Sequence, residues 1–348
     1  MRVSDFDFDL PAALIAQDPA PQRGDSRLMV LDRETGRISH ARSRDLPSFV
    51  GASDLIVVNE TRVFPARLRG RRLPGGGAVE CLLLRRLGDD TWDALVHPGQ
   101  KLHEGSRVVF EREGVRLTGE IAGRHFFGRR TLRLRAEGAD DVERAIDRLG
   151  EVPLPPYIRR APSPADRERY QTVYARVRGS VAAPTAGLHL TPSILDACRA
   201  RGASCAAITL HVGYGTFQPV RTDRVEEHRI DPEPWTIEPE AATAINAAMD
   251  ERRRIIAVGT TTTRTLEAAA ARHDGRLVPG SGEADLFIYP GYAFSVVGGL
   301  LTHFHLPRSS LLMLVAAFAG REPVLEAYRE AVARRYRFYS YGDAMLIL

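Results

Sequence analysis

The sequence predicts an α/β protein: a discontinuous α/β layered domain with a mostly parallel or mixed sheet, interrupted by an inserted small β-domain. In residues 1–62 and 157–348, strand patterns alternate with helical ones, as in domains where helices cover a sheet. In residues 63–156, short strands of alternating polarity follow one another about every ten residues between glycine clusters, as in small closed or sandwiched β-domains. We therefore expect an α/β domain built from 1–62 and 157–348 and a small β-domain, either closed into a barrel or sandwiched, at 63–156.

The first α/β strand is expected at 54–59, where an apolar run ends in polar residues. The inserted domain follows, and the proline-rich stretch 152–156 closes it. Its strands are expected at 79–84, 107–110, 115–121 and 131–135.

After the insert, strands and helices alternate again. Thr191 has the side chain of a helix N-cap, Pro192 suits the first helical position, and this helix ends by Gly202. Further strands are expected at 206–212 and 255–258, and further helices at 238–252, 263–272, 310–319 and 323–335.

Size and composition indicate a globular protein in a reducing compartment. The 348 residues, 44% of them apolar, suffice for two packed domains. The longest apolar run, 311–319, has about half the length of a bilayer span, and the first residues lack the pattern of a secretory signal. The cysteines Cys81, Cys198 and Cys205 have no paired spacing, which argues against disulfides or a zinc site. We expect a cytoplasmic location.

The basic side chains are almost all arginine, with Lys101 the only lysine, and the net charge is +4 at pH 7. Arginine runs at 67–72, 129–130 and 133–135 suit phosphate backbones, because a planar guanidinium forks onto phosphate oxygens. A solvated strand face is an equally good interpretation.

Polar, glycine-rich segments come directly after three of the predicted strands. They run from Asn59 to Arg62, from His211 to Thr216 and from Gly259 to Arg264. In open α/β sheets ligands gather at the carboxyl ends of the strands, so these segments are the candidate site. A fourth segment, Thr185 to His189, precedes the helix at Thr191 and is either a ligand-facing turn or a plain connector.

The glycines of these segments do not form a nucleotide fingerprint. Gln218 stands where the third glycine after Gly213 and Gly215 belongs, and no phosphate-binding loop of the nucleotide hydrolases occurs. The two glycines instead allow the backbone to approach a nucleoside, with Tyr214 as a flat face, or they form a bare turn.

The threonines from Gly259 to Arg264 place hydroxyls and free amide hydrogens at a helix start. This suits a carboxylate or ribose hydroxyls, with ordinary capping as the alternative. His303 and His305 share one face of an extended segment, while Phe304 points the other way. No carboxylate or cysteine lies at ligand spacing, so we expect no metal, but one functional and one hydrogen-bonded histidine.

Long motifs cover the chain from end to end in a characteristic order. They are SDFDFDLPAALIAQDPAPQRGDSRLMVLDR, DLIVVNETRVFPARLRG, LGEVPLPPYIRR, YQTVYA, SVAAPTAGLHLTP, LHVGYGTFQPV, GTTTTRTLE, DLFIYPGY, LPRSSLLMLVAAFAG and YSYGDAMLIL. In these motifs the chain resembles the S-adenosylmethionine:tRNA ribosyltransferase-isomerase family of queuosine biosynthesis.

The resemblance implies an α/β domain with an inserted barrel, a cytoplasmic location and a transferase-isomerase reaction. The ribosyl part of S-adenosylmethionine passes to 7-aminomethyl-7-deazaguanine at the tRNA wobble position, giving epoxyqueuosine with release of adenine and methionine. S-adenosylmethionine is then a co-substrate, and no cofactor is permanently bound. The partner is tRNA, and no membrane is involved. The oligomeric state, monomer or dimer, stays open.

This chemistry needs a base that takes a proton from the ribose 5′ carbon and a donor that protonates the departing adenine. His189 and His211 are the hypothesised proton-transfer groups, because imidazole exchanges protons near neutral pH. By resemblance, the substrate-binding residues are Asn59, Thr61, Arg62, Thr185, Ala186, Gly187, Gly213, Tyr214, Gly215, Thr216, Thr260, Arg264, His303 and His305.

The chain departs from the family pattern at three positions. Gly298 stands where Asp is usual, His303 where Asn is usual, and Asp231 where His is expected. A paralogue with an altered acceptor, or an RNA-binding module without turnover, are therefore the alternatives. Methyl transfer is disfavoured by the missing glycine fingerprint.

Overall fold

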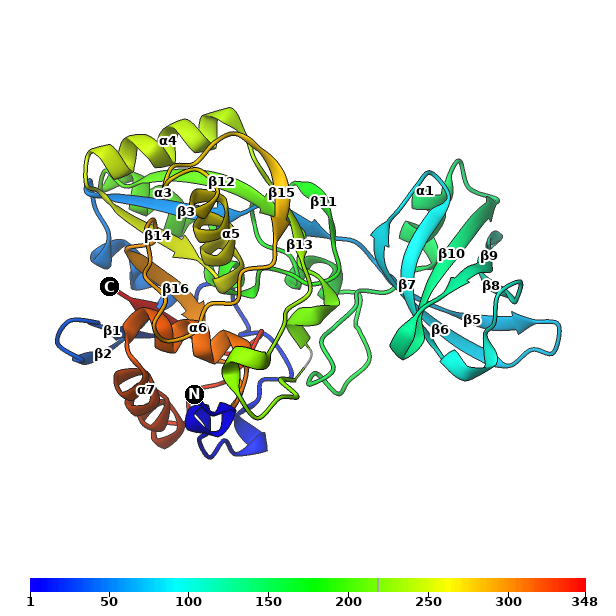
Figure 1. Cartoon of the computed structure of the whole chain (residues 1–348), viewed down its shortest axis with the longest axis horizontal. Coiled ribbons are helices and arrows are strands. Elements are labelled where there is room, and N and C mark those ends of the chain that lie inside the picture. Colours follow the sequence, from blue (N-terminus) through cyan, green and yellow to red (C-terminus); the bar gives the residue numbers. More distant parts are fainter. Residues whose placement is uncertain (218) are drawn as a thin grey trace.

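The computed structural model describes residues 1–217 and 219–348, so Gln218, where the glycine fingerprint fails, lies outside the described residues (Figure 1). The chain forms a large sheet covered by helices and, beside it, a separate closed barrel (Figure 1). The predicted fold class, an α/β layer carrying a small β-barrel, is confirmed.

The large sheet has nine strands in the order β15-β13-β12-β3-β14-β16-β17-β1-β2. Their bounds are β1 (Arg27–Leu31), β2 (Ile38–Arg42), β3 (Asp54–Asn59), β12 (Ser204–Leu210), β13 (Glu233–Ile237), β14 (Arg254–Val258), β15 (Gly280–Ala284), β16 (Gly299–His303) and β17 (Ala344–Ile347). The neighbours β12, β3, β14 and β16 are parallel. β17 is antiparallel to β16 and parallel to β1. The carboxyl ends of the four parallel strands and the amino ends of β17 and β1 therefore share one edge.

Helices cover both faces of this sheet. They are α3 (Pro192–Ala200), α4 (Pro239–Asp250), α5 (Thr260–Ala271), α6 (Ser310–Ala319) and α7 (Arg321–Ala333). The strand β3 is buried throughout, and its side chains alternate between the faces. Leu55 and Val57 join the core beneath α4 to α7, while Ile56 and Val58 join the core beneath α3. Burial on both faces explains why this strand reads as a continuous apolar run.

The helix starts test the local predictions. The hydroxyl of Thr191 accepts a hydrogen bond from the Ile194 amide, so its predicted N-cap role is confirmed. In contrast, α5 begins three residues before its predicted start at Thr263. The hydroxyls of Thr262 and Thr263 donate hydrogen bonds to the carbonyls of Val258 and Gly259, so both hydroxyls have partners within the helix.

The barrel closes in the order β10-β7-β6-β5-β8-β9. Its strands are β5 (Arg67–Leu73), β6 (Ala78–Arg86), β7 (Thr91–His97), β8 (Arg107–Arg112), β9 (Val115–Arg124) and β10 (Arg129–Glu137). The helix α1 (Val142–Leu149), which the strand patterns did not predict, packs Ile146 and Leu149 into the barrel core. Its signal in the sequence is Asp141, whose carboxylate caps the helix at the Arg144 amide.

Between sheet and barrel lie two short paired strands, β4 (Thr61–Val63) and β11 (Val177–Ser180), and the one-turn helix α2 (Asp166–Arg169). β4 leads directly from β3 into the barrel.

The arginine run 67–72 lies on β5 and faces carboxylates. Arg69 lies 3.3 Å from Glu151, and Arg71 lies 2.6 Å from Glu111. These pairs support the interpretation of a solvated strand face for this run. Within the described residues, no helix combines the length and apolarity that a membrane crossing requires.

Candidate functional site

A narrow cavity, here called the edge cavity, lies at the shared edge of the sheet. Its volume is about 30 Å³, which is room for about one water. It is lined by Tyr157, Ala182, Ala183, Pro184, Thr185, Ala186, Val212, Thr216, Gly259, Thr260, Thr261, Thr302, His303, Leu311, Tyr339 and Ser340. The predicted segments after β12 and β14 and the turn at Thr185 thus meet at one place. Ligand pockets typically hold about 300–1,000 Å³, so the walls must separate to admit a nucleoside.

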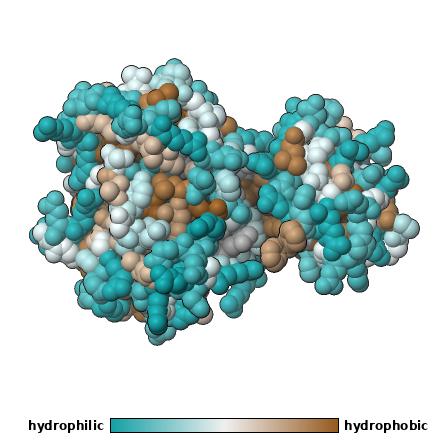
Figure 2. All heavy atoms as spheres, in the orientation of Figure 1, coloured by the Kyte–Doolittle hydropathy of each residue, from teal (hydrophilic) through white to brown (hydrophobic). Residues whose placement is uncertain are grey.

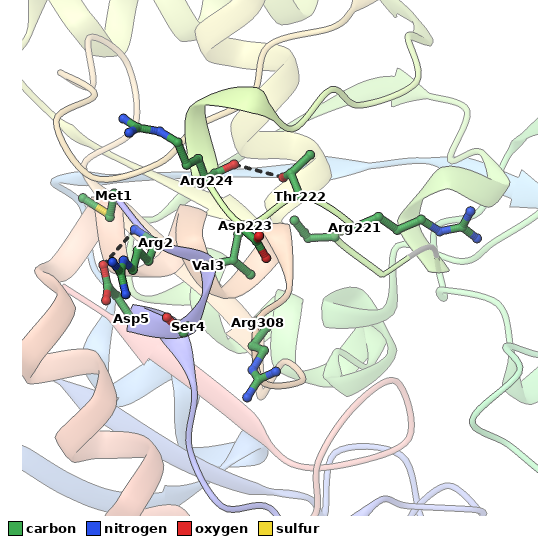
Figure 3. Close-up of a pocket in the computed structure, with 11 residues that line it drawn as sticks. Met1, Arg2, Val3, Ser4, Asp5, Arg221, Thr222, Asp223, Arg224 and Arg308 are labelled. Atoms are coloured by element: carbon green, nitrogen blue, oxygen red, sulfur yellow. Dashed lines mark hydrogen bonds between the residues drawn. The ribbon is translucent and has the colours of Figure 1, made fainter.

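A larger depression of about 1020 Å³ lies elsewhere, between the first residues of the chain and residues 220–224 (Figure 3). None of the predicted site residues line it. Several of its charges already have partners, since the terminal amino group pairs with Glu226 and Arg308 pairs with Asp7. Choosing the candidate site by volume alone would therefore select this depression, which lacks the polar residues that meet at the sheet edge.

The turn Thr185–His189 is a 3₁₀-helix whose residues are all buried. The hydroxyl of Thr185 lies 3.3 Å from Nδ1 of His303 and lines the edge cavity together with Ala186. A Cβ on Gly187 would lie 2.0 Å from the hydroxyl of Tyr174, so a glycine is required here by packing. Of the three predicted positions in this turn, Thr185 and Ala186 line the cavity.

His303 and His305 lie on the same side of their segment, as predicted, with ring centroids 4.5 Å apart. Phe304 points the other way, into the apolar core. Nε2 of His305 lies 3.0 Å from the Thr302 hydroxyl, whereas His303 lines the edge cavity. Burial lowers the pKa of His303 to about 3 and holds that of His305 well below its usual range, so both rings are neutral. The described residues contain no group of three or more side chains placed to hold a metal.

His189 lies behind the wall of the edge cavity. Its Nδ1 is 2.7 Å from the hydroxyl of Ser26, which is 2.7 Å from the hydroxyl of Ser43. Its Nε2 is buried without a hydrogen-bond partner among the described residues. Burial lowers the pKa of His189 to about 4, and the charges of Arg337 and Arg23 act in the same direction.

His211 lies next to Val212, a residue of the cavity wall, and is held by a chain of hydroxyls. Its Nδ1 is 2.8 Å from the Thr61 hydroxyl, which is 2.8 Å from that of Ser180. The ring lies against Gly179, where a Cβ would come within 2.5 Å of it. Burial lowers the pKa of His211. Thr61 therefore positions an imidazole.

Asn59 and Arg62 occupy different settings. The fully buried Asn59 amide donates to the Leu210 carbonyl and accepts from the amides of Leu210 and Thr61, so it joins β3 to β12. Arg62 is exposed on β4, and no interaction of its side chain with a described residue is found. Neither residue lines the edge cavity.

We expected Arg264 to contact substrate directly, but it does not line the edge cavity. It is buried one turn inside α5, and its Nη1 lies 2.7 Å from Glu233. The other carboxylate oxygen of Glu233 accepts from the Gly213 amide at 2.7 Å and from the Thr216 hydroxyl at 3.4 Å. Arg264 thus fixes the loop from Gly213 to Thr216 through Glu233, a residue that the sequence did not single out. The early start of α5 explains the difference.

Within that loop, Thr216 lines the edge cavity, while Tyr214 packs against the barrel core. Gly215 lies close to Asp231, because a Cβ on this glycine would be 3.3 Å from the Asp231 carboxylate. The loop therefore connects the cavity wall with the barrel.

The amino terminus of α5 faces the edge cavity with Thr260 and Thr261. The first amides of a helix have no intrahelical acceptor, and no side chain caps this helix. The buried hydroxyl of Thr261 has no hydrogen-bond partner among the described residues. This end of the cavity can accept a carboxylate or hydroxyl group.

Sequence reasoning missed the wall formed by Tyr157, Tyr339 and Ser340. The Tyr157 hydroxyl bonds to that of Ser340, and the rings of Tyr157 and Tyr339 have centroids 3.8 Å apart. Tyr339 has φ +74°, a region that bulky residues rarely adopt outside functional sites. The available signal was the aromatic YSYGD motif, but its position follows from the antiparallel pairing of β17 with β16.

The three departures from the family pattern lie in three different places. His303 is in the cavity wall, and Asp231 is beside Gly215. Gly298 precedes β16 at the opposite edge of the sheet, near Arg254. The change at Gly298 therefore does not touch the edge cavity.

Comparisons with known proteins agree over the whole chain. A family model described as queuosine biosynthesis protein matches residues 3–347. Relatives named S-adenosylmethionine:tRNA ribosyltransferase-isomerase from Heliobacterium modesticaldum and Symbiobacterium thermophilum are 52% and 53% identical over 348 residues, covering 100% of both chains in each case. A crystal structure of S-adenosylmethionine tRNA ribosyltransferase from Thermotoga maritima is 39% identical, with a TM-score of 0.56, over 99% of this chain and 100% of that chain.

Proposed function

The chain belongs to the queuosine biosynthesis protein family, and we propose that it acts as an S-adenosylmethionine:tRNA ribosyltransferase-isomerase. S-adenosylmethionine and tRNA are its substrates. The observation that carries this function is the full-length match to enzymes of that name. The edge cavity supports it, because segments far apart in sequence meet there around Thr185, Thr261 and His303.

In this proposal the acceptor is 7-aminomethyl-7-deazaguanine at the tRNA wobble position. The ribosyl part of S-adenosylmethionine is transferred and isomerised, epoxyqueuosine forms on the tRNA, and adenine and methionine leave. The amino terminus of α5, with the unpartnered Thr261 hydroxyl, is a binding place for the methionine carboxylate or the ribose hydroxyls.

His211 and His189 are the proposed proton-transfer groups. Because burial lowers both pKa values, both imidazoles are neutral near pH 7 and either can take the proton from the ribose 5′ carbon. Neither histidine lines the narrow edge cavity, so this role requires that the walls move apart on substrate binding far enough to expose the two rings. His189 offers its unpartnered Nε2 for this step.

His303 is proposed to contact substrate without moving a proton. Its Nδ1 faces the Thr185 hydroxyl, and the family pattern usually has Asn at this position, which also hydrogen-bonds a hydroxyl. His303→Asn should therefore retain most of the turnover.

The decisive experiment measures adenine release by the purified chain from S-adenosylmethionine, with and without tRNA carrying the aminomethyl base. We expect stoichiometric adenine release only with this tRNA. Release of S-adenosylhomocysteine would instead indicate methyl transfer, and RNA binding without adenine release would indicate a binding module.

The same assay tests the two histidines. His211→Ala and His189→Ala should each lower turnover about a hundredfold if they act as base or acid. Unchanged turnover in both variants would remove them from the mechanism.

A further inference from the structure

Two phenylalanines at the tip of the barrel are almost fully exposed. Phe126 and Phe127 are 87% and 90% exposed, whereas the other exposed large apolar side chains reach at most 48%. They lie in the short turn Phe126–Gly128, between β9 and β10. Figure 2 shows apolar side chains on the edge of the barrel that faces the α/β layer. Adjacent exposed rings of this kind mark an interaction site.

The backbone gives a second reason to regard these rings as selected for binding. Phe127 has φ +54°, a conformation that costs a bulky residue and that glycine adopts without strain. A turn that only had to connect two strands would favour glycine here. A phenylalanine kept in this conformation adds to the argument from exposure that the ring itself has a role.

The turn is held in place by a buried cation. The guanidinium of Arg130 donates to the carbonyls of Gly99, Leu102, His125 and Arg129. Arg130 is only 2% exposed, and it has no carboxylate partner among the described residues. Its charge therefore fixes the turn and also leaves the tip electropositive.

Two further arginines flank the rings. Arg124 is exposed, and its side chain has no ion pair or hydrogen bond with a described residue. Arg221, from the α/β domain, has its guanidinium carbon 6.0 Å from the Phe127 ring centroid, and its side chain points away from Met1 and Arg2 in Figure 3. The hollow beside the rings measures about 590 Å³, and none of the residues that line it is acidic. We name Arg124, Phe126, Phe127 and Arg221 the barrel-tip patch.

The barrel-tip patch is linked to the edge cavity through the loop at Thr216. Gly215, in that loop, lies beside Asp231. The pKa of Arg129 is raised by its hydrogen bond to Asp93 and also by the charge of Asp231, so Arg129 lies near this loop. Arg129 follows the turn of the two phenylalanines directly. A ligand that reaches the cavity from this side can therefore contact the patch as well.

We propose that the barrel-tip patch binds unpaired nucleotides of the acceptor tRNA beside the base that is modified. Phe126 and Phe127 stack on bases, while Arg124 and Arg221 contact phosphates. Aromatic rings among uncompensated cations are the combination by which proteins hold single-stranded nucleic acid, since every base has a flat face and every nucleotide a negative charge. The inference rests on the proposed function, because it deepens the recognition of the same substrate.

The test measures the KM for tRNA and the affinity for an RNA hairpin that carries fluorescent 2-aminopurine in its loop. Phe126→Ala and Phe127→Ala should each raise the KM for tRNA about tenfold and reduce the quenching of 2-aminopurine by stacking. The KM for S-adenosylmethionine should stay within about twofold. Phe127→Trp should retain RNA binding and Phe127→Leu should not, because only the former keeps a stacking surface.

Leu87→Ala is the matched control, since Leu87 is a 48% exposed apolar side chain elsewhere on the barrel. It should leave the KM for tRNA and the quenching unchanged. A wild-type KM in Phe126→Ala and Phe127→Ala would overturn the proposal, and so would equal RNA binding by the Leu and Trp variants, because stacking would then not be required. Absence of adenine release in the wild type would instead contradict the proposed function. The hairpin assay does not depend on turnover, so it would still test RNA binding by the barrel-tip patch.

Discussion

The edge cavity and the barrel-tip patch are linked through one loop, yet they handle their polar and apolar groups in opposite ways. Beside the cavity, the buried Arg264–Glu233 pair is partnered inside the protein, and only about 30 Å³ of the cavity stays open. In the patch, two rings are about nine-tenths exposed, and Arg124 has no partner among the described residues. We infer from this comparison that S-adenosylmethionine enters the cavity by replacing contacts within the protein, whereas tRNA supplies the interaction partners that the exposed patch lacks.

The largest effect is expected where the cavity depends on one buried ion pair. Glu233→Gln leaves the Arg264 guanidinium buried without its negative charge, which should cost about 3–5 kcal/mol of unfolding free energy. Urea denaturation measures this cost. Arg199→Ala, at an ion pair whose two side chains are 54% and 70% exposed, is the control and should cost about 1 kcal/mol or less. Similar losses in the two variants would show that the pair does not support the cavity.

The buried histidines of the cavity region predict an acid sensitivity that the exposed patch does not share. The pKa of His189 is about 4 in the folded chain and 6.5 ordinarily, so the unfolded chain binds the proton first as pH falls. The neutral ring therefore contributes stability fully above pH 6.5, and this contribution is lost towards pH 4. The loss is roughly 3 kcal/mol for His189. Unfolding free energies across this range measure it.

His189→Gln should reduce the steepness of this pH profile, since glutamine does not titrate, while His303 and His305, whose pKa values are also lowered, keep the rest of it. A profile as steep as that of the wild type would assign the acid sensitivity to other groups.

Thr261 is the exception in the cavity, because its hydroxyl is buried without a described partner. Thr261→Val should raise the KM for S-adenosylmethionine about tenfold, as expected for one lost hydrogen bond to a charged group. Stability should not fall, since no internal hydrogen bond is lost. Thr265→Val is the matched control on the same helix, because its hydroxyl bonds back to the Thr261 carbonyl. Equal KM values in the two variants would place the substrate elsewhere.

The smallest effect is expected on the other arginine-bearing surface of the barrel. Replacing Arg69 and Arg71 by Gln should leave the salt dependence of tRNA affinity unchanged, because both face glutamates. Replacing Arg124 and Arg221 by Gln should each lower the slope of log affinity against log salt by about one. The reverse pattern would move RNA binding from the barrel-tip patch to β5.

The sequence predicted the position of the site better than its contacts. The convergence of Thr216, Thr260 and His303 followed from a general property of parallel strands, whose carboxyl ends share an edge. Ser340 was missed because its position depends on the pairing of β17 with β16, which the local pattern does not show. Tyr157 was missed because its contact with Ser340 joins residues 183 apart in the sequence. Arg264 was placed at the ligand because the threonine segment was interpreted as a binding site ahead of a helix expected from Thr263, whereas α5 begins at Thr260 and the hydroxyls of Thr262 and Thr263 bond backwards along it.

The barrel and its aromatic turn show the same limit. Glycine clusters and alternating polarity predicted a small β-domain, and the family resemblance implied that it is a barrel. Two adjacent phenylalanines look the same in sequence whether they are buried or exposed. Their exposure depends on Arg130, which ties the turn to carbonyls that are distant in sequence.

The strand β4 joins the barrel to the chemistry of the sheet. Thr61, its first residue, holds the His211 ring by a hydrogen bond, and two residues later the chain passes towards the barrel. β4 is paired with β11, which ends at Ser180, the other hydroxyl of the same chain. The short strand that carries the chain into the barrel therefore also supplies the hydroxyl that orients one imidazole.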